Sequence, residues 1–277
     1  MTDLAQRIQD ELIQALERDQ LILPTLPEVA LRIREAAENP DIGINELARE
    51  ISNDTALSAR LIKVVNSPLL RSRQEITDLN MAVNRLGVVY TANLATGLAM
   101  AQLFQATTDI IDRRMREVWA RSTEVAGISH VLCRHYTDLK SDQAMLAGLV
   151  HLIGVLPILS YAEENSQLLE DATALDLIIE RIHPVIGDRI LEAWDFPQPL
   201  RHVPSQHIDF NRNPDRVDYA DIVQVAMLQS VAGTEHPHAM LDWTQISSFA
   251  RLGLNPASDE EEEDLSAEME AAMQLLN

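Results

Sequence analysis

The chain has 277 residues and a formal charge of −21. This charge repels phosphate backbones and argues against broad nucleic-acid binding. A single cysteine, Cys133, excludes an intramolecular disulfide and a Cys-x-x-Cys metal site, and it is typical of a reducing compartment. The acidic, amphipathic N-terminus is unlike a signal peptide. We expect a cytoplasmic protein without a membrane span.

Apolar residues recur at helical spacing along the first half of the chain, and strand-like alternation is nearly absent. Asp54, and Thr77 or Asp78, are typical residues before a helix, and Gly87 is typical of the position after one. The predicted helical segments of this half are 1–19, 27–39, two within 43–68, 77–87 and 88–106.

The second half continues the same pattern. Its predicted helical segments are 110–136, one from about 141, 166–181, 184–194 and 215–233. An acidic run at 259–264 then precedes a short amphipathic stretch, 265–276. We predict an all-α fold with an N-terminal helical bundle (1–108), a second helical subdomain (109–255) and an acidic tail (256–277).

One segment of the first half has helix–turn–helix spacing. The run "INELAREISNDTALSARLIKVVN" would place Arg60 and Lys63 on a DNA-recognition helix, or it is a pair of packed helices. Residues 1–110 hold 10 basic and 15 acidic side chains. Because recognition helices come with several phosphate-binding cations, this balance favours the packed pair.

A nucleophilic site is a second alternative, because Cys133 lies near His130 and His135 in the sequence. Helical spacing brings such residues close together in many proteins, so the spacing is not specific. A catalytic triad also needs an acid that orients the base, and none is evident here. The sequence therefore gives little support to a cysteine enzyme.

Histidines of the second half raise the question of a metal site. In "GLVHLIGVLPIL", the apolar helical spacing places His151 in or beside a packed core. A buried imidazole is either hydrogen-bonded or a metal ligand. His183, His202, His207 and Asp221 also belong to the second half, several of them at helix starts or on inward faces, and helical bundles build metal sites from such residues. The spacing leaves both interpretations open.

Several runs resemble one family of bacterial signalling domains, the HDOD family, which is related to the HD phosphohydrolases. In the first half they are "LPTLPEVALRIREAAENPDIGINELAREISNDTALSARLIKVVNSP" and "ITDLNMAVNRLG". In the second half they are "VWARSTEVAG", "MLAGLVHLIGVLPIL", "HPVIGDRILEAWDFPQPL" and "YADIVQVA". The resemblance covers roughly residues 20–230. It implies an HD-like helical core beside an N-terminal bundle, and a regulatory output rather than catalysis.

The resemblance also assigns site positions. Catalytic HD proteins hold their metal with a histidine, a His-Asp pair and a later aspartate. Those positions are Arg121, His151 with Leu152, and Asp221 in this chain.

Auxiliary histidines of the HD-GYP branch match His183 and His207. Leucine cannot ligate, and a guanidinium repels a cation. We therefore expect no catalytic residue and no cofactor; a reduced metal site of His151, His183, His207 and Asp221 is the alternative.

The expected function is a non-catalytic signalling module that binds other signalling proteins and neither nucleic acid nor a membrane. The former active-site cleft is a candidate site for a small ligand. The alternative is a metal-dependent phosphohydrolase or phosphodiesterase acting on nucleotides or cyclic dinucleotides. We further predict that Arg121 replaces the lost cation and pairs with Asp221. The acidic run predicts a loosely held tail, so truncation after Leu254 should leave thermal stability nearly unchanged. The oligomeric state is left open.

Overall fold

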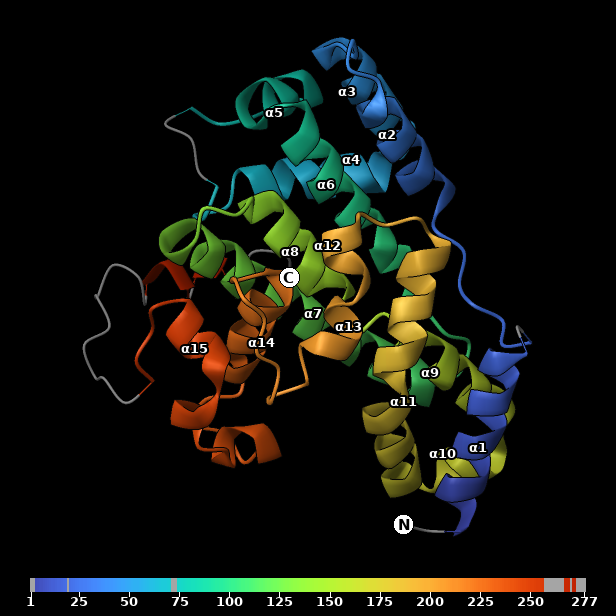
Figure 1. Ribbon diagram of the computed structural model, residues 1–277. Coiled ribbons are helices and arrows are strands. Elements are labelled where there is room, and N and C mark those ends of the chain that lie inside the picture. Colours follow the sequence, from blue (N-terminus) through green and yellow to red (C-terminus); the bar gives the residue numbers. More distant parts are fainter. Residues whose placement is uncertain (1–2, 19, 71–73, 257–266, 270, 273–277) are drawn as a thin grey trace.

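The computed structural model describes residues 3–18, 20–70, 74–256, 267–269 and 271–272, and within these ranges every regular element is a helix. Figure 1 shows a bundle formed by the first half of the chain above a larger helical body. The bundle consists of α2 (Glu28–Glu38), α3 (Ile44–Ser52), α4 (Thr55–Val65), α5 (Leu79–Leu86), α6 (Val88–Ala99) and the 3-10 turn η1 (Met100–Leu103).

The larger body is built around the longest helix. Its main helices are α7 (Asp109–Tyr136), α8 (Ser141–Val150), α9 (Val155–Glu164), α10 (Ser166–Glu170), α11 (Ala172–Ala193) and α14 (Tyr219–Ser230). The shorter elements are α12 (Gln198–Arg201), α13 (Val203–Gln206), η2 (Pro237–Met240), η3 (Trp243–Gln245) and α15 (Ser247–Arg251). The all-α prediction is confirmed.

Local signals in the bundle act as the sequence indicates. Asp54 accepts a hydrogen bond from the backbone N–H of Leu57 at 2.9 Å, and Asp78 accepts one from Met81 at 2.8 Å. Both therefore satisfy a free donor of the first helical turn. Gly87 has φ +84, a conformation that favours glycine, and it separates α5 from α6.

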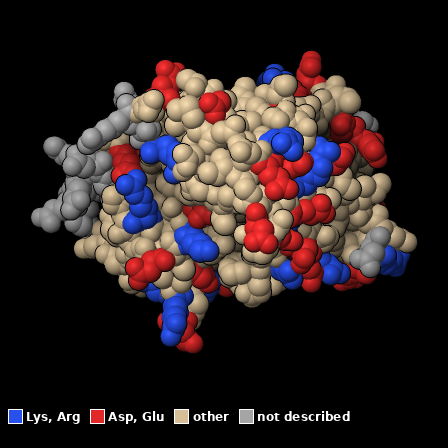
Figure 2. Space-filling model, turned by 90° about the horizontal axis from the view of Figure 1, so that it is seen from above, with Lys and Arg blue, Asp and Glu red and all other residues tan. Residues whose placement is uncertain are grey.

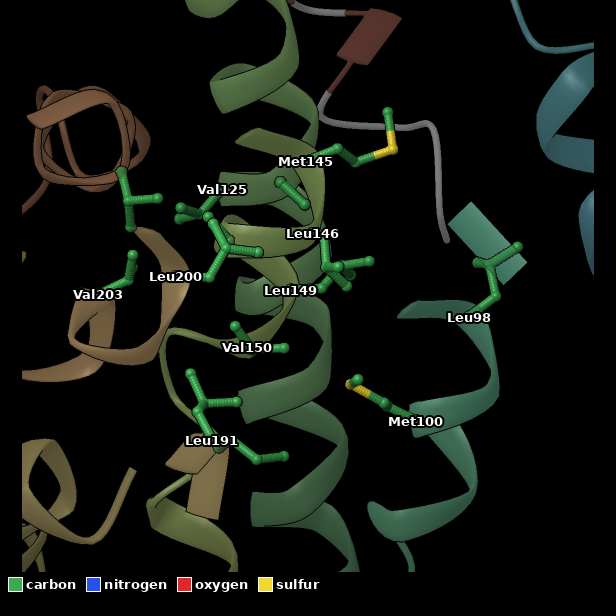
Figure 3. Packing of buried hydrophobic residues seen from close by; sticks show 14 of the residues in the cluster. Leu98, Met100, Val125, Met145, Leu146, Leu149, Val150, Leu191, Leu200 and Val203 are labelled. Carbon is green, nitrogen blue, oxygen red and sulfur yellow. The ribbon is translucent and has the colours of Figure 1, made fainter. Parts of the chain in front are cut away.

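The core of the larger body forms where α8 crosses α7. A Cβ at Gly148 would lie 2.5 Å from the Cα of Ala126, so only glycine allows this approach. Figure 3 shows Leu146 and Leu149 of α8 facing Leu98 across the junction with the bundle. These side chains are buried in one continuous core that includes both halves of the chain.

Helix α11 differs from the prediction of two segments, 166–181 and 184–194. It continues through Pro184 from Ala172 to Ala193, and a separate short helix, α10, precedes it. Ile178, Ile182, Ile186 and Ile190 recur every four residues and are all buried. This continuous apolar stripe holds the helix together, although the proline removes one backbone donor.

The N-terminal helix α1 (Asp3–Glu17) also differs from the predicted subdomains. It packs on α11 of the larger body, beside α10 in Figure 1, rather than within the bundle. Ile8 and Leu12 are buried there, and Tyr161 donates a hydrogen bond to Glu11 at 3.1 Å. The bundle proper therefore begins at α2, although the predicted boundary at 108/109 coincides with the start of α7.

Part of the tail is docked, against the expectation of a loosely held terminus. Residues 267–269 and 271–272 are helical, and Met269 and Ala272 are buried. Glu268 contacts Arg134 at 3.1 Å and His135 at 2.8 Å. The acidic run 259–264 lies outside the described residues. Met269 and Ala272 are therefore part of the core, which the charge pattern of the tail did not indicate.

One stretch of the described residues has the length and composition of a membrane span, although the sequence led us to expect no span. Residues 141–164 satisfy both criteria, but 83% of their most apolar window is buried inside the fold. A bent pair of helices, Leu79–Leu86 with Val88–Leu103, also satisfies them if it is counted as one span. A core helix of a globular protein has the same apolar composition, since its side chains contact other helices on all sides.

Candidate functional site: a histidine-lined cavity

A cavity of about 540 Å³ opens between α7, α11 and α14. Its lining residues are Arg121, His151, Leu152, Asp176, Ile179, Glu180, His183, His207, Ile208, Met227, Val231, His236, Pro237 and His238. Five of the six residues predicted for the former active site lie here together. Asp221, the sixth, is not among the lining residues.

The backbone around His151 brings two of the histidines together. His151 ends α8, and the chain turns through residues 151–154 before α9 begins. At Gly154 this turn lies directly on α11, because a Cβ there would be 1.9 Å from the carbonyl oxygen of His183 and 2.5 Å from the nitrogen of Gly187. The glycine therefore permits the contact that places His151 beside α11.

Three imidazole rings form the floor of the cavity. The ring centroids of His151 and His207 are 4.9 Å apart, and those of His183 and His207 are 6.2 Å apart. Each Nδ1 is bonded to a backbone carbonyl oxygen: His151 to Gly148 at 2.6 Å, His183 to Ile179 at 2.7 Å, and His207 to Val203 at 3.0 Å. A carbonyl can only accept, so each Nδ1 carries the proton and each Nε2 keeps a lone pair.

Burial keeps these rings neutral. It lowers the pKa of His151 to about 3, with neighbouring His183 and Arg121 acting in the same direction. It lowers the pKa of His183 to about 4 and that of His207 well below its usual value. At neutral pH the floor of the cavity is therefore uncharged and presents acceptors rather than donors.

The predicted pairing of Arg121 with Asp221 is wrong. Both carboxylate oxygens of Asp221 are bound by Arg251, at 2.6 and 2.9 Å, and Arg212 and Ser248 contact the carboxylate as well. Burial alone would raise the pKa of Asp221, but the bonds from Arg251 and Ser248 and the charge of Arg212 hold it below its usual value. The cation that compensates this aspartate comes from other parts of the chain.

The first turn of α14 explains why Asp221 lies outside the cavity. Asp218 accepts a hydrogen bond from the backbone N–H of Asp221 at 3.0 Å, and Asp221 accepts one from that of Asp218 at 3.3 Å. This capping box turns the side chain of Asp221 back toward the helix start. The cavity is lined instead by Met227 and Val231, later in the same helix. The spacing Asp-x-x-Asp was the sequence signal for this cap.

Arg121 lies on α7 as an exposed residue at the margin of the cavity. Two acidic residues of α11 also line this margin, Asp176 and Glu180, and Asp176 is paired with Arg114 at 2.6 Å. The side chain of Leu152, next to His151 in the sequence, is part of the apolar wall. A carboxylate is therefore replaced by a methyl-bearing surface at the position where the resemblance requires an aspartate.

Other lining residues were missed by sequence analysis. His236 and His238 come from the run "EHPHAM" at the start of η2, and their ring centroids are 4.8 Å apart. Burial lowers the pKa of both. Gln224 supports the backbone of one of the three floor histidines: its side-chain amide donates a hydrogen bond to the carbonyl oxygen of His207 at 2.9 Å. The sequence signal that could have identified these two residues is the pair of histidines on either side of Pro237.

The cavity does not fit a divalent metal as its residues stand. No group of three or more His, Cys, Asp or Glu side chains in the described part of the chain is arranged to hold a metal ion. The floor offers three neutral imidazoles and no carboxylate, and the guanidinium of Arg121 adds a positive charge nearby.

The cysteine alternative finds no support in the structure. Cys133 is buried, its Sγ is 3.4 Å from the hydroxyl of Thr137, and burial raises its pKa. A reactive cysteine needs a lowered pKa and access. His130 is bonded to Tyr90 at 3.2 Å, and His135 contacts Glu268. Neither histidine forms an activating pair with the thiol.

The helix–turn–helix candidates Arg60 and Lys63 line a second cavity, of about 700 Å³, together with Trp119 and Arg116. Arg116 is paired with Asp112. On the face shown in Figure 2, basic side chains are interspersed with acidic ones and form no continuous basic surface. This arrangement matches a packed helix pair better than a DNA-reading helix.

Comparison with known protein families gives one match. Residues 23–210 match the family model of the HDOD domain. An uncharacterized protein of Treponema pallidum (strain Nichols) is 27% identical in an alignment of 245 residues that covers 82% of this chain and 46% of that protein. The chain thus spans about half the length of this curated relative.

Solved structures extend the similarity to the whole chain. A candidate metal-dependent phosphohydrolase from Shewanella amazonensis SB2B is 31% identical, is covered 100% in both directions and has a TM-score of 0.89. An HDOD domain protein of unknown function from Geobacter sulfurreducens is 22% identical, with 92% of this chain and 91% of that chain covered and a TM-score of 0.64. The second likeness shows the fold alone.

Proposed function

The chain belongs to the HDOD domain family, and from that premise we propose that it is a cytoplasmic signalling or regulatory module that binds other proteins and does not catalyse hydrolysis. One observation carries the proposal. Leu152 lines the cavity beside His151, where hydrolysis through a metal needs a carboxylate. The bridging ligand of such a site is therefore replaced by an apolar side chain.

The charge around the cavity supports the same conclusion. Arg121 stands at the position where the family resemblance places another ligand, and it lines the cavity, while Asp221 is bound by Arg212 and Arg251. A metal hydrolase lowers the pKa of a bound water by concentrating positive charge among anionic ligands. The described residues supply no such set, so the helical frame is left for binding.

The test is a hydrolysis assay on the purified full chain. We expect no turnover of bis(p-nitrophenyl) phosphate or of cyclic dinucleotides above background with Mn²⁺, Mg²⁺ or Fe²⁺. Metal-dependent turnover that is lost in His151→Ala would overturn the proposal. Cross-linking the intact chain in its own cells, with Leu152→Asp as a comparison variant, then asks which proteins bind it.

A second candidate is a metal-dependent phosphohydrolase that acts on nucleotides or cyclic dinucleotides. It is favoured by the three Nδ1-to-carbonyl hydrogen bonds, because metal-bound histidines commonly anchor their second nitrogen in this way. Metal analysis of the purified protein separates the two candidates. Stoichiometric metal that survives dialysis and disappears in His183→Ala would favour the enzyme.

A further inference from the structure

Three ring nitrogens of histidines that line the cavity have no hydrogen-bond partner: Nδ1 of His238, Nε2 of His151, whose residue is fully buried, and Nε2 of His183, whose residue is 6% exposed. The two Nε2 atoms are acceptors, because the Nδ1 of each of these two rings already donates to a backbone carbonyl. A buried acceptor that no donor reaches is unfavourable, and native proteins rarely leave one without protein, water or ligand.

The rest of the cavity narrows the kind of molecule that fits these acceptors. Leu152, Ile179, Ile208, Met227 and Val231 supply an apolar wall. The floor has three imidazole rings and no donor pointing inward from them. A volume of about 540 Å³ lies within the range of small-molecule sites in proteins.

Charge excludes the ionic alternatives. An anion would face the lone pairs of His151 and His183, and the cation among the lining residues, Arg121, is exposed at the margin. A bare cation would find no carboxylate on the floor, because Asp176 and Glu180 lie at the margin, Asp176 is already paired with Arg114, and the guanidinium of Arg121 lies at the same margin. An uncharged molecule avoids both penalties and still satisfies the acceptors.

We infer that this cavity binds a small, uncharged organic molecule that donates hydrogen bonds from at least two N–H or O–H groups on an apolar or planar body. Its donors reach Nε2 of His151 and of His183, and its body packs on the apolar wall. The inference does not depend on whether the protein partners of the module are found.

A ligand in this cavity would contact residues from four helices of the larger body. His151 ends α8, His183 belongs to α11, His207 ends α13, and Met227 belongs to α14. A ligand bridging these residues stabilises their packing, because it binds the folded arrangement alone. The former active site thereby becomes an input site for the module.

The experiment uses a matched pair of probes and the full chain. Benzimidazol-2-one is neutral, planar and has two adjacent N–H donors; its 1,3-dimethyl derivative keeps the ring and loses both donors. We expect the first to raise the melting temperature and to bind in calorimetry, and the second to bind about tenfold more weakly or less. Phenyl phosphate and ZnCl₂ serve as anionic and metal probes and should give no stabilisation.

Variants locate the binding. His183→Leu removes one acceptor and leaves an apolar side chain in its place. Leu152→Phe reduces the volume of the cavity and leaves both histidines in the chain. Both should reduce binding of benzimidazol-2-one, whereas His202→Leu should not. His202 is a matched control, because its side chain is 55% exposed and is bonded to Asp188 outside the cavity. Histidine ¹⁵N spectra of the wild-type chain should show Nε2 of His151 and His183 shifting on binding.

Three results would overturn the inference. Equal binding of the two benzimidazolones means an apolar cavity in which the acceptors take no part. Absence of binding at millimolar concentration, with unshifted Nε2 signals, means that water satisfies the histidines. Stoichiometric Zn²⁺ binding that is lost in His183→Leu means that the rings close on a metal instead. The first two results leave the hydrolysis assay of the proposed function untouched, so the failures are distinguishable.

Discussion

Arg251 forms a two-point ion pair with Asp221, which lies 30 positions earlier in the chain: Nε is 2.9 Å from Oδ2, and Nη2 is 2.6 Å from Oδ1. The carboxylate is fully buried, and Arg212 contacts it from a second side. Paired in this way, the two residues fix α15 to the start of α14. A planar guanidinium suits this arrangement because its donors match the two carboxylate oxygens.

We expect Arg251→Met to lower the free energy of unfolding by about 3–5 kcal/mol, since it leaves a buried charge with one cation fewer. Asp221→Asn in the same chain should recover part of the loss. Arg121→Ala, by contrast, should change stability by about 0.5 kcal/mol or less, because Arg121 is exposed. Urea unfolding of five proteins measures this: the wild type, Arg251→Met, Asp221→Asn, the double variant and Arg121→Ala. Additive effects of the first two substitutions would contradict it.

Protonation of the cavity histidines should make stability depend on pH. The pKa of His151 is lowered to about 3 and that of His183 to about 4, below the value of about 6.5 in an unfolded chain. The unfolded state therefore binds more protons below pH 6.5. Their stabilising contribution is complete above that pH and is lost as the pH falls toward 4.

Urea unfolding between pH 7.5 and 5 measures this slope. His183→Leu should reduce it by up to about 1.4 kcal/mol per pH unit, since one proton-binding site of the unfolded chain is removed. Met227→Leu changes the same cavity without changing a titrating group, so it should keep the slope. An unchanged slope in His183→Leu would contradict the assignment of a neutral, buried ring.

The docked end of the chain should contribute to stability. A Cβ at Gly127 would lie 2.2 Å from the carbonyl oxygen of Ala272, and a backbone atom cannot move away as a flexible side chain can. We expect Gly127→Ala to displace residues 267–272 and to lower the melting temperature, as truncation after Leu254 should also do. Gly43→Ala is the control, because nothing lies within 4 Å of its Cβ. Equal melting temperatures for the truncated and full chains would show that the contact adds nothing.

Gly154 should be the least replaceable glycine near the cavity. Alanine there meets backbone atoms of His183 and Gly187 in α11, so α9 or α11 has to shift, at a cost of about 1–3 kcal/mol or more. Gly97→Ala is a graded comparison, because its Cβ meets the flexible end of Leu149 at 2.3 Å. We expect Gly154→Ala to be the more destabilising in urea and to shift the ¹⁵N signals of His183. A similar loss of stability in the two variants would mean that α9 and α11 can move apart at little cost.

Local and periodic features were readable from the sequence. The all-α architecture follows from apolar spacing, and the helix starts after Asp54 and Asp78 follow from capping chemistry. These features depend on neighbours within one or two turns, so the sequence contains the information directly. The family motifs likewise brought Arg121, His151, Leu152, His183 and His207 into one candidate site.

Tertiary structure alone decided which cation compensates Asp221, where α1 packs and whether the tail docks. Each depends on contacts between residues far apart in the chain: Arg251 with Asp221, α1 with α11, and Ala272 with Gly127. A buried aspartate needs a compensating cation, but the sequence contains several arginines and does not show which of them pairs with Asp221. The choice is made by helix packing, because the direction of a side chain on its helix determines which partner it can reach.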